Sequence, residues 1–580
     1  MSTQPSNRVL STTLSLILLQ VSSRLLSFGL NQALLRSTSP EAFGLATIKF
    51  DTLIGTVLFL LREGIRGAVV RVRSSSSAVN SDPSARLRAQ TLSLPLYLTP
   101  LALLSFTVYS SFSTPTPPPP HFTLTLTFYF LSTLIELLFE PLYLHTLQQW
   151  ESLTTGRVRV EGMAVMVKAL VTLAAVKTLA KDEGLLAFGL GQLAYSSTIW
   201  VGLATLVSRA QAAAPSSTSI SDRAEKAGDK AGWGLQRIEG LYFDPQITGL
   251  GWALTKQSVV KQLLTEGDKL AVGRFGSGQD MGGYAVALNY GSLIARLLFQ
   301  PLEESSRLYF STLSTPTPSL PTLILASTYL RLLLLLQTHL TLLFIFLAPS
   351  YTTPLLHLLL GPTWSTTAGP ILRAYAFSLP FMGLNGLTEA FFQSTASEKW
   401  IRRGSGWMCV CAVAFAGTVA TLCGDGGEGG GRGMGAKGLI VANCVNLALR
   451  TGFSSVFIWT FFESALSEVG KGQGSEGQEQ KEEEKRKVRE QLIWKAWTPN
   501  VATTLAFGIA GWVVRESEGK WEAEAGYKGL RATVQHLGVG AAVGLGCLGI
   551  VFLTRRHELQ NLVKAMKGAK TEPTKEKRSE

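Results

Sequence analysis

The sequence contains few residues of the kinds that build catalytic and metal sites. There are only five cysteines and six histidines among 580 residues. The cysteines lie in or beside apolar segments, and the histidines are scattered without the spacing of metal ligands. The sequence therefore indicates neither a disulfide framework nor a zinc site. The cysteines are Cys409, Cys411, Cys423, Cys444 and Cys547, and the histidines are His121, His145, His339, His357, His536 and His557.

Motifs for nucleotide binding and sugar transfer are also missing. The glycine-rich stretch Gly424–Gly435 is followed by Ala436, Lys437 and Gly438, which lack the Gly-Lys-Ser/Thr end of a P-loop. No Asp-x-Asp occurs, although a membrane-embedded glycosyltransferase needs acidic residues to hold a metal or to act as a base. We therefore expect no enzyme, no metal and no cofactor.

Charge is scarce as well. Of all residues 16% are charged and 46% are hydrophobic, and the mean hydropathy is +0.23. This composition is typical of a polytopic membrane protein and too apolar for a soluble protein of this length. The formal net charge of +13 does not indicate a nucleic-acid partner, because the basic residues lie in loops between apolar runs, where membrane proteins carry their cytosolic charges.

Apolar stretches of about 20 residues, long enough to cross a bilayer, recur along the chain. They predict an all-α polytopic membrane protein with about fourteen transmembrane helices, arranged as two pseudo-symmetric six-helix lobes plus two C-terminal helices. The first stretch, from Val9 to about Arg36, lacks a signal-peptide cleavage pattern. The predicted parts are an N-lobe (1–209), a cytosolic linker (210–245), a C-lobe (246–463), a cytosolic polar loop (464–497), two helices (498–554) and a basic cytosolic tail (555–580). Within the polar loop, the composition of Gly470–Lys487 predicts disorder.

The two halves of the sequence resemble each other at several places in the same order. Because each half carries six predicted spans, the repeats have the same topology, which points to two parallel lobes related by an axis along the membrane normal. At a shift of about 240 residues, Gly44-Leu45-Ala46 and Glu63-x-x-Arg66 match Gly283-Tyr284-Ala285 and Glu304-x-x-Arg307. At a shift near 254, Glu136 matches Glu389, and Gly184 and Gln192 match Gly438 and Asn446.

Charged and polar residues inside apolar sequence are densest in Ser258–Phe310. Such residues are costly in a bilayer unless they face a bundle interior, a hydrated cavity or each other, so they predict a polar pathway. The alternative is a set of interhelical ion pairs, with residues at helix ends reaching to the headgroups. The residues concerned are Lys261, Glu266, Asp268, Lys269, Arg274, Asn289, Arg296, Glu303 and Glu304.

This stretch contains two motifs, LTEGDK at Leu264–Lys269 and NYGSLIARLLFQPLEES at Asn289–Ser305. Both resemble the signature of the Rft family. Further segments that resemble the family lie in order along the chain, so the chain is identified as a member of it. These segments are Leu18–Arg36, Leu58–Arg71, Ile371–Phe392 and Gly438–Arg450. The family is grouped with the multidrug/oligosaccharidyl-lipid/polysaccharide exporters, whose two-lobe plan agrees with the repeat.

The resemblance implies a function in N-linked glycosylation. An endoplasmic-reticulum membrane protein of this family is needed to translocate dolichyl-pyrophosphate-linked Man5GlcNAc2 from the cytosolic to the lumenal leaflet. Two alternatives stay open: an essential non-transporting accessory or scaffold of lipid-linked oligosaccharide assembly, and a multidrug-type antiporter. The glycan lipid is the only partner implied, and the sequence indicates no protein partner.

Arginines within the predicted spans are the candidate substrate contacts. The planar guanidinium binds phosphate oxygens in pairs and keeps its charge, which suits a pyrophosphate in a partly dry space. For Arg36, Arg373 and Arg450, which lie near predicted span ends, snorkelling is the alternative. The candidates are Arg24, Arg36, Arg296, Arg331, Arg373 and Arg450.

Two further groups complete the candidate site. Glu136, Glu140 and Glu389 could form a proton or cation site, but we favour ion pairing, and Pro141 predicts a helix break beside Glu140. The doubled Glu-x-x-Arg predicts clasps that close the cytosolic side. The polar-pathway or ion-pair candidates are Gln20, Asn31, Glu136, Glu140, Glu266, Asp268, Lys269 and Glu389, and the clasp candidates are Glu63, Arg66, Glu303, Glu304 and Arg307.

The loops alternate between basic and non-basic, which predicts an orientation with both termini in the cytosol. The segments Gly276–Met281 and Ala348–Gly369 contain no Lys or Arg and are expected on the lumenal side. An N-glycosylation acceptor inserted into either segment should be modified, whereas one inserted into Gly470–Lys487 should not. A gel-shift assay in microsomes reads this out, and the reverse pattern would contradict the orientation.

Overall fold

The structure is a computed structural model with two compact units, Met1–Ala285 and Val286–Glu580. It describes residues 29–73, 87–88, 90–113, 118–148, 150–180, 183–213, 241–311, 313, 319–423, 433–469, 478–525 and 530–569. These residues form helices and no strands. The all-α prediction is confirmed.

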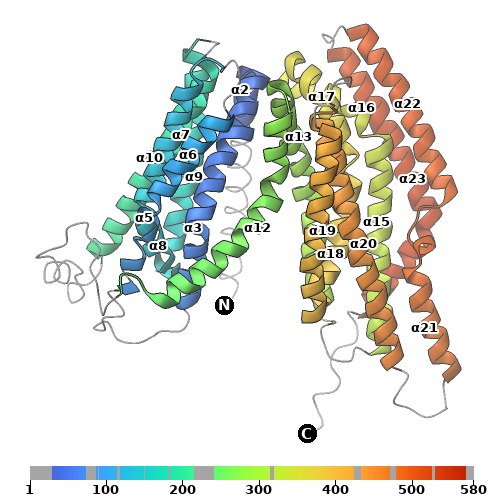
Figure 1. Ribbon diagram of the computed structural model, residues 1–580. Coiled ribbons are helices and arrows are strands. Elements are labelled where there is room, and N and C mark those ends of the chain that lie inside the picture. The colour runs from blue at the N-terminus through green and yellow to red at the C-terminus, as the bar shows by residue number, and fades with distance from the viewer. Residues whose placement is uncertain are drawn as a thin grey trace, which may run out of the picture. The chain divides into compact units, whose positions relative to one another are not determined.

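The first unit is built from long helices with short interruptions (Figure 1). After a helix at residues 29–37, its elements are α2 (Pro40–Gly44), the π-helical η1 (Leu45–Phe50), α3 (Asp51–Arg73), α5 (Leu94–Tyr97), α6 (Thr99–Ser113), α7 (Phe122–Leu138), α8 (Glu140–Gln148), α9 (Trp150–Thr178), α10 (Gly184–Ala213) and α12 (Pro245–Phe275). The element α13 (Gly278–Ile294) contains the boundary between the units.

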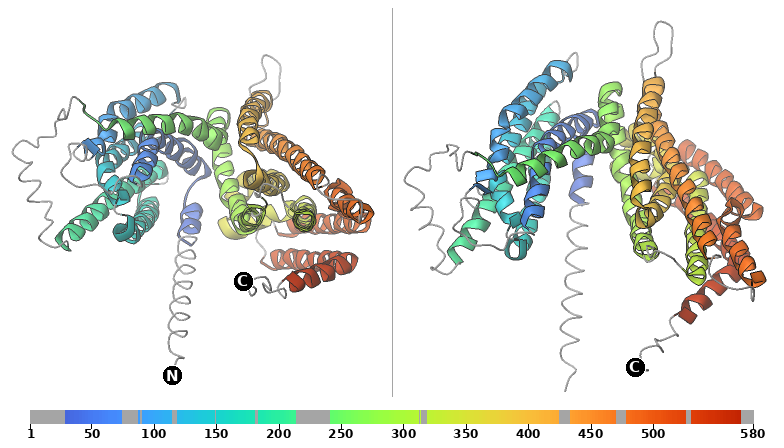
Figure 2. Two further views of the ribbon diagram at one scale, coloured as in Figure 1. Left: turned by 90° about the horizontal axis from the view of Figure 1, so that it is seen from below. Right: turned by 60° about the horizontal axis from the view of Figure 1, so that its bottom comes forward.

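Within the second unit, α15, α19, α20, α22 and α23 run alongside one another (Figures 1 and 2). The elements of this unit are η5 (Ala295–Phe299, π-helical), α14 (Gln300–Ser311), α15 (Leu320–Phe346), α16 (Pro349–Leu360), α17 (Pro362–Ala376), α18 (Leu379–Thr395), α19 (Glu398–Cys423), α20 (Ala436–Glu468), α21 (Gln478–Leu492), the short 3-10 helix η6 (Trp494–Ala496), α22 (Val501–Ala525) and α23 (Leu530–Ala569).

Among the described residues, six helical segments are long and apolar enough to cross a membrane, and a bent pair makes a seventh candidate. Many of their large apolar side chains are exposed, as lipid-facing residues are; Val413 and Leu545 are 72% and 68% exposed. The chain is therefore an all-α polytopic membrane protein, while a total of about fourteen spans stays a prediction. The six segments are Pro40–Val70, Gly184–Ala210, Leu320–Phe346, Glu398–Cys423, Ala436–Glu468 and Arg531–Arg556.

The bent pair is α7 and α8, which meet at Phe139 with a bend of 45°. Pro141 explains the bend, because its ring has no N–H and clashes with the carbonyl of Leu137, four residues earlier. The predicted break beside Glu140 is confirmed. It turns the acidic residues of this span toward α3, which contacts both helices.

The helix α12 packs along α3 within the first unit. Asp244 caps its start, where the Oδ1 atom accepts from the backbone N–H groups of Gln246 and Ile247 at 2.8 and 3.4 Å. The first compact unit thus includes a helix that the predicted division assigned to the C-lobe. Of the segment Gly276–Met281, which is expected between two spans, residues 278–281 belong to α13.

The segment Ala348–Gly369 was predicted as a loop, and this is wrong. It forms α16 and the start of α17, two helices in contact with each other. Gly361 joins them with φ of 98°, which a residue with a Cβ rarely adopts. Leu356 and Trp364 are buried at 0% and 1% exposure, so apolar burial holds a segment that lacks charge. The predicted span 370–393 is interrupted where α17 ends at Ala376 and α18 begins at Leu379.

The prediction of disorder for Gly470–Lys487 is wrong for residues 478–487, which belong to α21; residues 470–477 lie outside the described residues. Ion pairs one turn apart stabilise this exposed helix, and hydrogen bonds from Lys485 and Lys487 lower the pKa of the Glu482 and Glu483 carboxyls. Val488, fully buried, joins the apolar core with α15. The pairs are Glu482–Lys485, Glu483–Lys487 and Arg486–Glu490.

The two segments that carry the first repeat motifs share an unusual feature. Each is a long helical stretch interrupted by one π-helical turn: η1 between α2 and α3, and η5 between α13 and α14. Isolated π turns occur often at functional sites, because the extra residue re-aims the side chains around it. The pseudo-symmetry of the two lobes stays a prediction.

Candidate functional site

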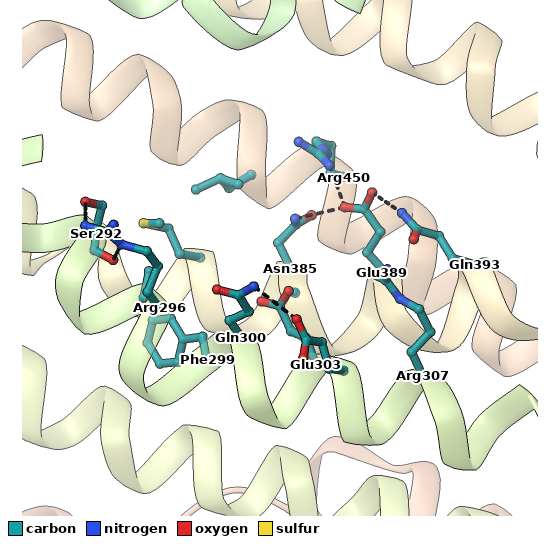
Figure 3. Close-up of a pocket in the computed structure, with 15 residues that line it drawn as sticks. Ser292, Arg296, Phe299, Gln300, Glu303, Arg307, Asn385, Glu389, Gln393 and Arg450 are labelled. Carbon is teal, nitrogen blue, oxygen red and sulfur yellow. Dashed lines mark hydrogen bonds and ion pairs between the residues drawn. The ribbon is translucent and has the colours of Figure 1, made fainter. Parts of the chain in front are cut away.

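The second unit contains a polar cavity of about 530 Å³ (Figure 3). Its walls come from η5, α14, α18 and α20, together with Ser292 at the end of α13. Three arginines and three glutamates face it, so the cavity carries both signs of charge. These are Arg296, Arg307, Arg450, Glu303, Glu304 and Glu389.

Glu389 is the centre of the hydrogen bonding in this cavity. Arg450 of α20 forms an ion pair with it at 2.5 Å. The amides of Asn385 and Gln393, one turn before and one turn after it on α18, donate to its two oxygens at 3.1 and 2.9 Å (Figure 3). Residues four apart lie on one helix face, so α18 presents an amide–carboxylate–amide row to the cavity.

Two groups in the cavity are available to a ligand. Arg296 donates to the backbone oxygen and the hydroxyl of Ser292, one turn earlier, both at 3.2 Å, and in the described part of the chain it forms no ion pair. Asn385 is 7% exposed, and among the described residues its Oδ1 has no hydrogen-bond partner. Buried polar atoms are normally satisfied, so this oxygen can accept from a ligand hydroxyl.

The first unit contains a second, closed polar network. Arg62 of α3 contacts Glu136 at 2.9 Å and Glu140 at 3.6 Å. Arg66, one turn later, binds both oxygens of Glu140 at 2.5 and 2.7 Å and lies 3.9 Å from the centre of the Tyr143 ring. The two carboxylates are 6% and 1% exposed, so these are buried ion pairs.

The α10 helix completes this network. Ser196 and Gln192 donate to Glu136 at 3.1 and 3.5 Å. Lys168 of α9 links Gln192 to Asp51 at 2.7 and 3.2 Å, and the Tyr129 hydroxyl donates to the same carboxylate at 3.1 Å. Donors from α3, α7, α9 and α10 therefore reach these acids, and the network connects four helices of the first unit.

The two networks lie at positions that match in the internal repeat, but acidic, basic and neutral side chains are distributed differently between these positions. The shift that matches Gln192 with Asn446 also matches Ser196 with Arg450, and the shift that matches Glu63 with Glu304 matches Arg62 with Glu303. In the first unit Glu136, on the fourth predicted span, therefore pairs with Arg62 at the end of the second span. In the second unit the matching acid, Glu389, pairs with Arg450 of the twelfth span. Glu303 stands where the first unit has Arg62.

The remaining arginine candidates lie elsewhere. Arg331 donates to the backbone oxygen of Ala496 at 3.0 Å, and Arg373 pairs with the buried Glu518 of α22. Arg36 is exposed near the end of the helix at residues 29–37. Arg24 lies outside the described residues. The structure thus brings Arg296 and Arg450 together at one cavity and places Arg331 and Arg373 in contacts within the second unit.

The other polar candidates make local contacts. Glu266 pairs with Lys269 at 2.7 Å, and Asp268 accepts from the Tyr284 hydroxyl at 2.9 Å. Asn31 is half-buried, and Gln20 lies outside the described residues.

Neither Glu-x-x-Arg motif forms an ion pair between its own members in the described structure. Arg66 binds Glu140 instead, Glu63 is exposed, and Glu304 accepts from Gln300 at 3.0 Å. A role of these residues in closing the cytosolic side stays a prediction.

The sequence interpretation missed Arg62, Gln192, Ser196 and Asn385. A signal existed for Arg62, because Arg62 and Arg66 are spaced like Glu136 and Glu140, four residues apart. Two arginines on one helix and two glutamates on a neighbouring helix can form two ion pairs when both are spaced by one helical turn. No signal in the sequence marked the pairing of α10 with α7.

Comparison with known proteins places the chain in a family. The model of the family described as Rft protein matches residues 8–565. The chain belongs to the Rft family. It is 31% identical to the Man(5)GlcNAc(2)-PP-dolichol translocation protein RFT1 of Yarrowia lipolytica, across 78% of this chain and 70% of that protein. The protein of the same name from Schizosaccharomyces pombe is 31% identical, across 77% and 81%.

A solved structure shares the fold of this Rft-family chain. The lipid II flippase MurJ in an inward closed conformation aligns with a TM-score of 0.54 across 93% of this chain and 99% of that chain, at 13% identity. The likeness at this identity concerns the fold alone. It agrees with a polytopic, all-α membrane protein, and the resemblance to the Rft family seen in the sequence motifs is confirmed.

The closed network of the first unit predicts the effect of removing one partner. Arg62→Met should leave Glu136 without its arginine and destabilise the protein by about 3 kcal/mol, because an unpaired buried charge is costly. Adding Glu136→Gln should restore part of that loss. Thermal unfolding of the purified protein in detergent measures both, with Arg402→Met, whose side chain is 79% exposed, as the control. Unchanged stability in Arg62→Met would contradict this assignment.

Proposed function

We propose that this protein translocates dolichyl-pyrophosphate-linked Man5GlcNAc2 from the cytosolic to the lumenal leaflet of the endoplasmic reticulum. The observation that carries the proposal is the match to the Rft family over residues 8–565, together with relatives that are named translocation proteins for this lipid. The protein is a transporter in this proposal, and it catalyses no covalent step.

The physical need for such a protein is clear. Each sugar hydroxyl taken unpaired into hydrocarbon costs several kcal/mol, and a pyrophosphate costs far more. The cavity of the second unit supports the proposal, because its arginines suit phosphate oxygens, while Asn385, Gln393 and the glutamates offer donors and acceptors to sugar hydroxyls.

Orientation and location belong to the same proposal. The alternation of basic loops supports cytosolic termini, and the dolichol lipid in the relatives' names supports the endoplasmic-reticulum membrane. With this orientation the segment Glu398–Arg403, which begins α19, faces the cytosol, so the Gln393 end of the cavity lies toward the leaflet from which the lipid is taken.

Arg296 gives the sharpest test, because its hydrogen bonds in the described part of the chain go to Ser292, one turn earlier, and tie it to no other helix. Arg296→Ala should slow translocation about 10- to 100-fold, the equivalent of one or two charge-assisted hydrogen bonds of about 1.5–3 kcal/mol. Arg296→Lys keeps the charge but loses the bidentate geometry, so its rate should lie in between. The amount of folded protein should not change in either variant.

The measurement uses purified protein in liposomes that contain the glycan lipid, with exposure of the glycan on the outer leaflet followed over time by a mannose-binding lectin. Arg402→Ala, at an exposed arginine outside the cavity, is the matched control. If the unaltered protein fails to translocate the lipid but restores N-glycosylation in cells that lack it, the accessory function replaces the proposed one.

A further inference from the structure

A second hollow lies beside the polar cavity, between α18, α19 and α20. It has a volume of about 300 Å³ and shares Glu389, Gln393 and Arg450 with the cavity. The rest of its lining is mainly apolar, with Phe392, Ile401, Trp407, Met408 and Phe453. We call this hollow the lateral groove. The residues that it shares with the cavity are polar, and most of its other lining residues are apolar.

The apolar wall of the lateral groove is held rigidly. The indole N–H of Trp407 donates to the backbone oxygen of Leu449 at 3.0 Å, so the only polar atom of this ring is satisfied within the protein. The ring stacks on Phe453 with centroids 5.9 Å apart, and Phe392 meets Phe453 edge-on at 5.6 Å. The wall is therefore preformed for an apolar ligand.

Gly404 of α19 lines this hollow and lets the helix lie close to the Phe392 ring. It is buried, and a Cβ atom at this position would lie 3.0 Å from the Phe392 ring and 3.5 Å from the Phe453 ring. The neighbouring Ile401, by contrast, is 51% exposed, so the groove is open to the surface beside the start of α19. A chain of carbon atoms can enter it through this opening.

From these contacts we infer that the lateral groove holds the first isoprene units of a polyisoprenyl pyrophosphate, with the pyrophosphate bound at Arg450 in the adjoining cavity. The inference rests on the proposed function and adds the place of the lipid tail. The kind of ligand follows from the junction, by which we mean the place where the polar cavity and the apolar groove share Glu389 and Arg450. A lipid tail alone would put carbon against the Glu389–Arg450 ion pair, whereas an amphiphile with a phosphate at its end matches both halves.

The junction can accept a phosphate without leaving a bare acid. Arg450 donates to one oxygen of Glu389, while the amides of Asn385 and Gln393 donate to both of its oxygens. The bond to Glu389 uses one Nη atom of Arg450, and a guanidinium carries five N–H donors. The remaining N–H groups can donate to a phosphate while Glu389 keeps its partner, so the ion pair marks the position where the headgroup meets the tail.

Photolabelling tests the position of the tail. The probe is a polyprenyl-pyrophosphate-GlcNAc2 with a diazirine in its first isoprene unit, added to the full-length protein in liposomes, with labelled residues mapped by mass spectrometry. We expect labelling at Ile401, Met408 and Phe453. An excess of unlabelled glycan lipid should reduce it at least 10-fold, and an equal excess of phosphatidic acid should not.

Substitutions that fill the groove test the same site by mutation. Gly404→Leu should reduce groove labelling and translocation at least 10-fold, whereas Gly406→Leu, where a Cβ would meet nothing within 4 Å, should behave as the unaltered protein. If Gly404→Leu lowers the amount of folded protein, Ile401→Trp fills the groove from its open side, with Val413→Trp on the same helix as its control.

The outcomes separate this inference from the proposed function. The glycan lipid could compete with labelling that is located on α22 and α23. That result would contradict the lateral groove as the tail site and would agree with the proposed function. Competition by phosphatidic acid as strong as that by the glycan lipid would make the groove a site for bilayer lipids and overturn it as well. If the glycan lipid competes labelling nowhere on the protein, the proposed function fails, and the groove fails with it.

Discussion

The need to match carboxylates buried among apolar helices is the constraint on which the rest of the structure depends. Moving a charge out of water costs several kcal/mol unless a partner and further hydrogen bonds compensate. The buried acids Glu136, Glu140, Asp244 and Glu518 each contact an arginine. Their partners are Arg62, Arg66, Arg88 and Arg373 respectively. These pairs tie α3 to the bent α7–α8 span, the start of α12 to the residues before α5, and α17 to α22.

The same constraint is met differently in the two units, and this difference locates the site. In the first unit Glu136 accepts from Arg62, Ser196 and Gln192 and is 6% exposed. In the second unit the matching acid, Glu389, keeps 26% of its side chain exposed beside the cavity. The buried network connects the helices of one unit, whereas the partly exposed pair of Glu389 and Arg450 can take a ligand.

Much of this architecture could be predicted from the sequence, where local chemistry decided it. The length of the apolar runs predicted membrane helices, and Pro141 predicted the bend at Phe139. The spacing of Glu482, Lys485, Glu483 and Lys487 is a helix signal too, although the polar composition predicts disorder. The burial of Val488 in the apolar core explains why α21 is held. The apolar, uncharged segment before Gly369 lacked a signal that separates a short helix pair from a loop.

The sequence could not predict which residues of the site pair with each other. Glu389 and Arg450 were both candidates, but they lie 61 residues apart, and only the packing of α18 on α20 pairs them. Arg373 had the same residue type and a similar place near a span end, yet it binds Glu518. Residue type and span position therefore selected the candidates, while helix packing decided which ones face the cavity.

The central claim is that the polar cavity of the second unit is hydrated and takes the glycan lipid, while the network of the first unit is closed. Cysteine accessibility in a protein without its native cysteines tests this directly. Gln393→Cys should react with a water-soluble thiol reagent and be protected by the glycan lipid, and Ser196→Cys, at a fully buried position, should stay unreactive. Equal reactivity at both positions, or reactivity at residue 393 that the lipid leaves unchanged, would contradict the account.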